Sequence, residues 1–372
     1  MYEADKSVTA RRLGGSLDLG KETGLAAVQA AGLLNRFLEL ARPEGQELRA
    51  MSHQGELLFH NQGTETLESD AYNPEIDRGD LNRVLLEAIP MDTIRWDHKL
   101  LSVARLEYTI ELHFADGSVE TADMVVGADG AWSRVRPMIT SETPQFCGAT
   151  FLDCAIEEFD SRFPDLIDVV GKGSLFSFDG GNILIAQRNA HGVVRVYLGF
   201  KSQVDWRQHD AIVDAEDDFS RLKTLVSAFY HNWDTRLQKL ATVAVEAKKK
   251  QGSRIQQWPL YALPVGHKWQ HSPGATLIGD AAHLMSPCAS EGVNMAMLDA
   301  LELANQIAEA AKMGSDTDAA IAKFEAEMFS RVQPPAQWSA ENLELFLSAP
   351  EMTMDGVKQL FFRKLKPSSE TI

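Results

Sequence analysis

The sequence predicts an α/β protein in which a three-layer domain is interleaved with a second domain built on a mixed or antiparallel sheet. Two observations predict the three-layer domain. Short apolar segments at 124–126 and 275–278 each run into a turn of glycine and aspartate that is followed by a helical pattern. A third observation predicts the sheet domain, because residues 146–265 alternate between apolar and polar side chains and contain several glycine turns.

The individual elements follow from local periodicity along the chain. Apolar residues at helical spacing predict one amphipathic helix near the N-terminus and a second one for which Asp77 is a plausible N-cap. One helix is expected inside the sheet domain, two follow the second glycine–aspartate turn, and one ends the chain. In order, these six helices are expected at about 25–40, 78–89, 215–230, 294–312, 317–331 and 354–365.

These patterns divide the chain into two interleaved domains and a tail. We expect the three-layer domain to be discontinuous, because the sheet pattern interrupts it twice. The predicted three-layer domain comprises 1–48, 76–145 and 268–345; the sheet domain comprises 49–75 and 146–267; the C-terminal helix and tail comprise 346–372.

Composition excludes several classes of function. The chain has 372 residues, 44% of them hydrophobic, so a large core can form without metals or disulfides. A net charge of −17 argues against nucleic-acid partners and anionic membranes, whose binding requires basic patches. No apolar run reaches the roughly 18 residues of a membrane span, so no integral membrane association is expected.

Cysteine and histidine usage points to a reducing compartment and to no metal site. Three cysteines without Cys-x-x-Cys spacing, behind an N-terminus without signal character, predict free thiols and a cytoplasmic location. His267 and His271 have i, i+4 spacing, but no carboxylate cluster accompanies them and prolines flank them. We therefore predict that no metal is bound.

The second glycine–aspartate turn is the main candidate for a binding site. A strand end, a tight turn and a helix N-terminus leave backbone N–H groups free, and these can hold a pyrophosphate while the aspartate accepts from ribityl hydroxyls. His283 in this turn is expected to be packed and hydrogen-bonded rather than a base. The predicted cofactor contacts of this segment are Gly279, Asp280, Pro287, Gly292, Val293 and Asn294.

Three segments carry a family resemblance. Gly279–Pro287, continued by Glu291–Asn294, resembles the Gly-Asp motif of FAD-dependent group A aromatic hydroxylases. Gly127–Arg136 resembles their Asp-Gly motif, which the family links to FAD and NADPH, and this makes Asp129 a cofactor candidate. Ala10–Leu19 closely resembles the matching stretch of the tetracycline-inactivating flavin monooxygenases.

The resemblance also assigns single residues. It associates Arg11 with NADPH and Asp18 with FAD. It makes Glu3 the candidate for binding the adenosine ribose, although a frayed terminal glutamate is the alternative. It makes Arg78 the arginine that reaches the flavin from a helix start; the alternative is an exposed arginine paired with Asp77 or Asp80.

The sequence departs from the family in two places. The family's first strand, Gly-x-Gly-x-x-Gly loop and first helix are expected before Tyr2 and are not in the printed sequence; a late-starting gene model and a real loss both remain open. Ser290 and Glu291 stand where many relatives have glycine and glutamine.

Candidate substrate residues lie in the sheet domain. Phe151, Asp153 and Arg195 align with positions that are amides or histidine in the tetracycline-acting relatives. The changed character argues against tetracycline as substrate. Ordinary sheet positions remain an equal alternative for each of the three residues.

The resemblance implies an FAD-binding three-layer nucleotide-binding domain interleaved with the sheet domain, plus the C-terminal helix. It implies an FAD- and NAD(P)H-dependent monooxygenase that hydroxylates an aromatic or polycyclic, polyketide-like small molecule with O2 through a flavin C4a-hydroperoxide. The alternatives are another flavin oxidoreductase of the same fold and a non-enzymatic remnant unable to retain FAD. The choice of NADPH or NADH, the catalytic residues and the oligomeric state stay open.

Overall fold

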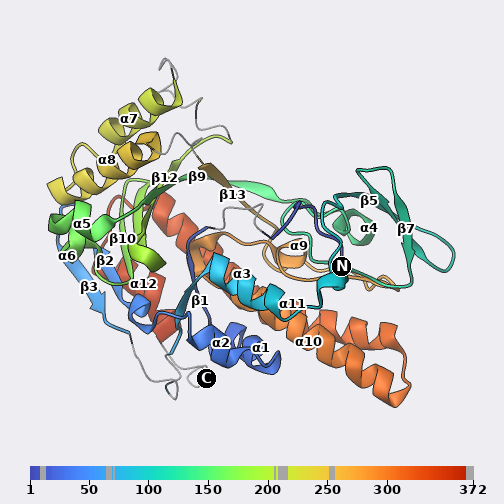
Figure 1. The fold of residues 1–372 in the computed structure, drawn as a ribbon. Coiled ribbons are helices and arrows are strands. Elements are labelled where there is room, and N and C mark those ends of the chain that lie inside the picture. Colours follow the sequence, from blue (N-terminus) through green and yellow to red (C-terminus); the bar gives the residue numbers. More distant parts are fainter. Residues whose placement is uncertain are drawn as a thin grey trace.

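The computed structural model describes residues 1–8, 14–63, 69, 72–204, 207, 217–250 and 256–365. A large sheet with its covering helices lies on one side, and the small sheets and the helix pair α10 (Gly292–Met313) and α11 (Thr317–Ser348) lie toward the other (Figure 1). The large sheet is antiparallel except where β10 runs parallel to β2. Its strands, in spatial order, are β13 (Gln256–Ala262), β9 (Gln145–Ile156), β12 (Val194–Lys201), β11 (Asn182–Arg188), β10 (Ser174–Asp179), β2 (Leu48–Met51) and β3 (Leu57–Asn61).

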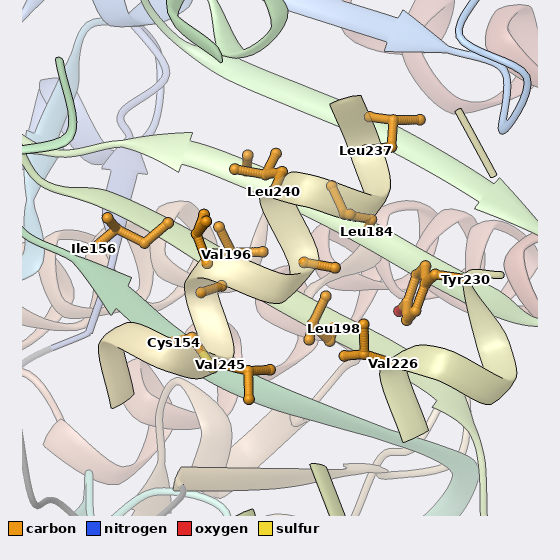
Figure 2. Packing of buried hydrophobic residues seen from close by; sticks show 14 of the residues in the cluster. Cys154, Ile156, Leu184, Val196, Leu198, Val226, Tyr230, Leu237, Leu240 and Val245 are labelled. Atoms are coloured by element: carbon orange, nitrogen blue, oxygen red, sulfur yellow. The ribbon is translucent and has the colours of Figure 1, made fainter. Parts of the chain in front are cut away.

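One face of this sheet is covered by the helices α7 (Asp218–Phe229) and α8 (Thr235–Lys250). Strand alternation sends Cys154, Val196 and Leu198 to this face, where they pack against apolar residues of both helices (Figure 2). The predicted helix at 215–230 corresponds to α7, but α8 is a second helix where the sequence predicted none. Its apolar positions bury against the sheet, and that packing stabilises the helix.

The opposite face carries a second cluster. Phe178 and Ile183 of the sheet pack with Phe346 of α11 and Val357 of α12 (Met354–Leu365). The predicted C-terminal helix is therefore confirmed, and it closes this face of the sheet. The shorter helices of this half are α5 (Phe159–Arg162) and α6 (Ile167–Val170).

The remaining strands form three small sheets. The parallel pair β8 and β14 packs against residues of α11 in one apolar cluster. An antiparallel three-stranded sheet contributes to the same cluster. Helices α1 and α2 replace the single predicted helix, because the chain breaks at Gly32 with a φ of +75°. The strands of the three small sheets are β1 (Ser16–Asp18) with β4 (Glu75–Asp77), β8 (Val125–Gly127) with β14 (Ala275–Leu277), and β5 (Leu100–Arg105) with β6 (Ile110–Phe114) and β7 (Val119–Ala122). The helices of this half are α1 (Gly24–Ala30), α2 (Leu34–Leu38), α3 (Arg78–Glu87), α4 (Arg136–Ile139), α9 (Asp280–His283) and α10 (Gly292–Met313).

Helix α11 differs most from the prediction. It was expected to end near residue 331, before two prolines, yet it spans Thr317–Ser348 with Pro334 and Pro335 inside it. Proline removes a helix hydrogen bond and normally ends or kinks a helix. Here Phe324 packs in the core beside β14 and Phe346 packs against the large sheet, so burial at both ends outweighs that cost.

The predicted α/β fold class, with a mixed sheet and a C-terminal helix, is confirmed. The boundaries between the two predicted domains stay a prediction. Among the described residues, no helix combines the length and the apolar character needed to cross a membrane.

Candidate functional site

The Gly279 turn has the predicted strand–turn–helix geometry. Strand β14 ends at Leu277, Gly279 adopts a φ of +59°, and α9 begins at Asp280. The Gly279 carbonyl accepts hydrogen bonds from the N–H groups of Ala282 and His283 at 2.8 and 2.9 Å. A Cβ at this position would strain the backbone and lie 3.1 Å from the Ala296 Cβ. Glycine is therefore required where the chain turns toward Asp280.

The N-terminus of α10 faces this turn with free donors. Within the described residues, the N–H groups of Gly292, Val293 and Asn294 donate no hydrogen bond, and the side chain of the N-cap residue does not cap them. No atom lies within 4 Å of the place where a Cβ on Gly292 would sit. Because α10 is 22 residues long, these free groups form a place for an anion or a carbonyl oxygen. Pro287, which is exposed, begins the single helical turn that precedes α10.

Asn294 joins two of the predicted cofactor segments. Its side-chain oxygen accepts from Gly20 N–H at 2.9 Å and Thr23 Oγ1 at 3.1 Å, and its Nδ2 donates to the Asp18 carbonyl at 3.1 Å. The structure thus brings Asp18 and Asn294 together although 276 positions separate them. Because the amide is occupied by the protein, Asn294 offers a ligand its backbone N–H.

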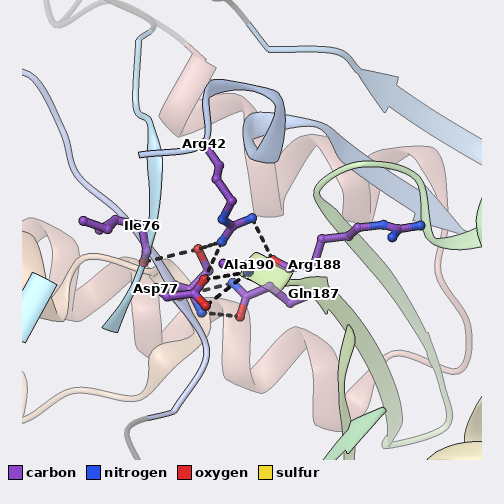
Figure 3. Close-up of polar contacts among 7 residues, drawn as sticks. Arg42, Ile76, Asp77, Gln187, Arg188 and Ala190 are labelled. Atoms are coloured by element: carbon purple, nitrogen blue, oxygen red, sulfur yellow. Dashed lines mark hydrogen bonds and ion pairs between the residues drawn. The ribbon is translucent and has the colours of Figure 1, made fainter. Parts of the chain in front are cut away.

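The two acidic neighbours of Arg78, Asp77 and Asp80, are engaged by other residues. Figure 3 shows the Asp77 carboxylate accepting from Arg42 Nη2 at 2.7 Å and from Ala190 N–H at 3.1 Å. Asp80 pairs with Arg83 at 2.8 Å. The alternative in which Arg78 pairs with Asp77 or Asp80 is therefore wrong, and Asp77 makes no side-chain cap bond to α3.

The network of Figure 3 also holds the large sheet against strand β1. Arg42 donates to Ser16 Oγ at 2.8 Å and to the Arg188 carbonyl at 3.1 Å. Gln187 accepts from Ser16 N–H at 3.0 Å and donates to its carbonyl at 3.2 Å. A Cβ at Gly15 would lie 2.3 Å from the Gln187 side-chain oxygen, so a larger residue there would force the Gln187 side chain to move.

The charge of Arg78 acts on a residue of the Gly-Asp turn and on a residue of the large sheet. This exposed guanidinium makes no ion pair within the described residues, and its charge acts on both Asp280 and Tyr197. Burial raises the pKa of the Asp280 carboxyl, while the charges of His283, Arg78 and Arg136 act to lower it. The Asp280 residue itself is exposed, so a ligand can reach its carboxyl.

Two side chains of the Asp-Gly turn accept hydrogen bonds from the backbone N–H groups that follow them. Asp129 accepts from Arg134 N–H at 2.6 Å, and Ser133 Oγ accepts from Val135 and Arg136 N–H at 3.1 and 3.0 Å. The helix that follows, α4, is only 4 residues long. A direct contact of Asp129 with a cofactor stays a prediction.

Arg136 is a site residue that the sequence did not single out. Its guanidinium is buried and donates to the Ala281 and Asp280 carbonyls at 2.7 and 3.0 Å and to the Ala131 carbonyl at 2.9 Å. Burial lowers the pKa of this guanidinium, and the carboxylates of Asp129 and Asp280 act in the opposite direction. Arg136 therefore ties the Asp-Gly turn to the Gly-Asp turn. Its position at the end of the Asp-Gly motif was the available signal.

The structure does not join Glu3 to this group. Glu3 follows a parallel bridge between Tyr2 and Arg95, and its carboxylate accepts from Asp5 N–H at 2.9 Å. In the part of the chain that the structure describes, no contact links Glu3 to the Gly279 turn. Arg11 lies outside the described residues.

The candidate substrate residues take two different roles in the sheet. Asp153 is 2% exposed, and its two oxygens accept from Arg195 Nη1 at 2.5 and 2.6 Å. Tyr197 lies opposite Asp153 on β12; burial, together with the Asp153 charge, raises its pKa to about 12. Phe151 packs over Gly199 in the apolar cluster of this face. Direct substrate contact by any of these residues stays a prediction.

Comparison with known proteins gives consistent results. The family model described as FAD binding domain matches residues 21–337. Monooxygenase penA of Penicillium thymicola is 31% identical over 79% of this chain and 74% of its own. A 3-amino-4-hydroxybenzoate 2-monooxygenase, PtmB3, of Streptomyces platensis is 28% identical over 80% of this chain and 68% of its own. The crystal structure of the tetracycline destructase Tet(55) superposes with a TM-score of 0.69 at 20% identity and covers 98% of this chain and 87% of that one.

Proposed function

Since the chain belongs to the FAD binding domain family and is an FAD-dependent monooxygenase, we propose that it uses NAD(P)H and O2 to hydroxylate an aromatic or polycyclic, polyketide-like molecule. The observation that carries this proposal is the position of Arg78. Its backbone N–H donates to the Gly15 carbonyl at 3.1 Å, and Gly15 closely approaches the Tyr197 side chain of the sheet, while the charge of Arg78 acts on both Asp280 and Tyr197. These contacts support the proposal that the cofactor motif and the substrate sheet face one another there.

The residues around Arg78 fit the chemical groups of FAD. Asp280 can accept from ribityl hydroxyls, and the unpaired guanidinium of Arg78 can meet a phosphate or the electron-rich edge of the ring. The free N–H groups at the start of α10, beginning with Gly292, can receive a flavin carbonyl or a phosphate oxygen. We propose that these groups hold the cofactor.

The reaction we propose consumes one substrate, O2, NAD(P)H and a proton, and it yields the hydroxylated product, NAD(P)+ and water. Bound FAD supplies the oxygen-transfer chemistry, which we assign to its C4a-hydroperoxide. The protein binds the two ring systems, orients them and excludes water.

The substrate class rests on two supports. The Streptomyces platensis relative is named for an aromatic substrate. In this chain, Asp153, Arg195 and Tyr197 form a polar group on the otherwise apolar sheet face, and such a group can orient a flat molecule through its polar substituents. We further propose a cytoplasmic location, on the cysteine pattern of the sequence.

Two variants test the cofactor assignment. Asp280→Ala and Arg78→Ala should each weaken FAD binding by about tenfold, since a bond to a charged group contributes roughly 1.5–3 kcal/mol. Arg83→Ala is the matched control, because Arg83 lies on the same helix and pairs with Asp80. FAD titration by fluorescence quenching measures the affinity. Affinities equal to that of the control would show that neither residue holds FAD.

A second experiment tests the reaction. Aromatic compounds are offered with NADH or NADPH under isotopically labelled O2, and the product mass is measured. Incorporation of one labelled oxygen atom with stoichiometric NAD(P)H oxidation is the expected result. Oxidation of a compound without labelled oxygen would identify a different flavin oxidoreductase.

A further inference from the structure

A buried carboxylate lies directly behind the Gly279 turn. Asp299 of α10 is 0% exposed. Its Oδ2 accepts hydrogen bonds from Gly279 N–H at 3.0 Å and from His283 Nε2 at 2.5 Å. Its Oδ1 accepts from Arg331 Nη2 at 2.9 Å, and Arg331 reaches it from α11. This one side chain therefore joins the turn to the two long helices.

The three donors keep Asp299 ionised in a place without water. Burial acts to raise the pKa of the carboxyl, but the hydrogen bonds from His283, Gly279 and Arg331 outweigh it and the pKa is lowered. An ionised carboxylate can only accept, so its position is determined by the directions of its three donors. Moving this carboxylate away from its donors would leave a buried charge without hydrogen bonds, which costs free energy. The carboxylate therefore holds its three donors in place.

Gly279 depends on this carboxylate for its orientation. A glycine has no Cβ to restrict its backbone, so hydrogen bonds must select one conformation. The Gly279 carbonyl is occupied by the N–H groups of Ala282 and His283, and its N–H is occupied by Asp299. Both peptide groups that flank Gly279 are thereby fixed, and with them the direction in which Asp280 leaves the turn.

We propose that Asp299 is a positioning residue of the FAD site, which acts on the cofactor through Gly279 and Asp280 without touching it. The inference rests on the proposed function, in which Asp280 holds FAD. Loss of the Asp299 charge should release the turn and allow Asp280 to adopt orientations that do not bind the cofactor. Affinity for FAD should fall although the ligand-facing residues are unchanged.

The same core contains a matched control. Glu325 of α11 is 2% exposed and accepts from Trp269 Nε1 at 3.0 Å, Thr276 Oγ1 at 2.8 Å and His271 Nδ1 at 2.8 Å. It resembles Asp299 in burial and in the number of its donors. Its donors, however, lie before the Gly279 turn, so Glu325→Gln should destabilise the core without releasing Asp280.

The experiment compares wild type with Asp299→Asn, Glu325→Gln and Asp280→Ala. Each purified protein is stripped of flavin and titrated with FAD, its thermal unfolding is followed without FAD, and the visible absorption and circular dichroism of the bound flavin are recorded. Both Asp299→Asn and Glu325→Gln should lower the melting temperature. Of these two variants, only Asp299→Asn should weaken FAD binding, by about tenfold for one lost bond to a charged acceptor, and alter the flavin spectrum.

The outcomes separate the two proposals. Equal FAD affinities of Asp299→Asn and Glu325→Gln would overturn the positioning role of Asp299. If Asp280→Ala keeps wild-type affinity, the FAD assignment of Asp280 fails, and this inference fails with it. If Asp299→Asn does not fold, Arg331→Met replaces it, because it removes only the donor farthest from the turn. Its affinity should then lie below that of Glu325→Gln, and an affinity equal to the control would be decisive against the inference.

Discussion

Replacement of Arg136 by alanine should destabilise the protein more than any exposed arginine change. Arg136 is 3% exposed, and its three shortest bonds, 2.7, 2.9 and 3.0 Å long, end on carbonyls of the two motif turns. Among the described residues no carboxylate forms an ion pair with this guanidinium, so these carbonyls are its main partners. In Arg136→Ala, three carbonyl oxygens lose their donor at once.

The expected magnitude follows from these three carbonyls. Water can enter the space that the side chain leaves, so each carbonyl should cost near the low end of the unsatisfied range, about 1 kcal/mol. The sum is about 3 kcal/mol in the free energy of unfolding. At roughly 2 °C per kcal/mol for a chain of this size, the melting temperature should fall by about 6 °C.

Arg134→Ala is the matched control. Arg134 belongs to the same motif, is exposed, and makes no side-chain hydrogen bond or ion pair within the described residues. Such surface changes usually alter stability by less than about 0.5 kcal/mol. Differential scanning calorimetry of the two variants without FAD measures the difference. Equal melting temperatures would refute the clamp that we assign to Arg136.

Two further predictions concern a strained residue and a pH effect. Ser290 has a φ of +56°, so Ser290→Gly should relieve backbone strain. After subtraction of the extra conformational entropy that glycine gives the unfolded chain, the folded protein should be stabilised by about 0.5–1 kcal/mol. Ser290→Ala keeps the Cβ and should bring no gain. Thermal unfolding of the pair decides this, and a gain for alanine would contradict it. Because the pKa of Asp299 is lowered on folding, its contribution is complete above its unfolded pKa, near 4, and is lost as the pH falls through the lower folded value. The difference in melting temperature between wild type and Asp299→Asn should therefore shrink below about pH 4, and a constant difference down to pH 3 would argue against it.

Local features were the ones that the sequence predicted well. The turn after β14 and helix α12 (Met354–Leu365) both lie where the pattern indicates. In both cases the deciding interactions act within a few residues, through glycine backbone freedom and apolar periodicity. The same local rules failed at Pro334 and Pro335, because packing at the two ends of α11 outweighs the broken hydrogen bonds.

Residues that act between distant segments were missed. Arg136 meets Ala281 across 145 positions, and Arg331 meets Asp299 from another helix. In the sequence, Arg136, Asp299 and Arg331 are each an ordinary charged residue in a helical pattern. Nothing local distinguishes a buried charge from a solvated one, since burial depends on which elements the fold brings together.

The sequence by itself determined the α/β class, the two glycine–aspartate turns and the family, because each rests on residue types at short, fixed spacing. Only the tertiary structure decided that Asp77 pairs with Arg42 and leaves Arg78 free, and that Asp299 holds Gly279. The physical reason is that the partner of a charged side chain depends on which opposite charges lie near it in space and on how far burial removes water from the charge. Both are set only when helices and sheets have packed.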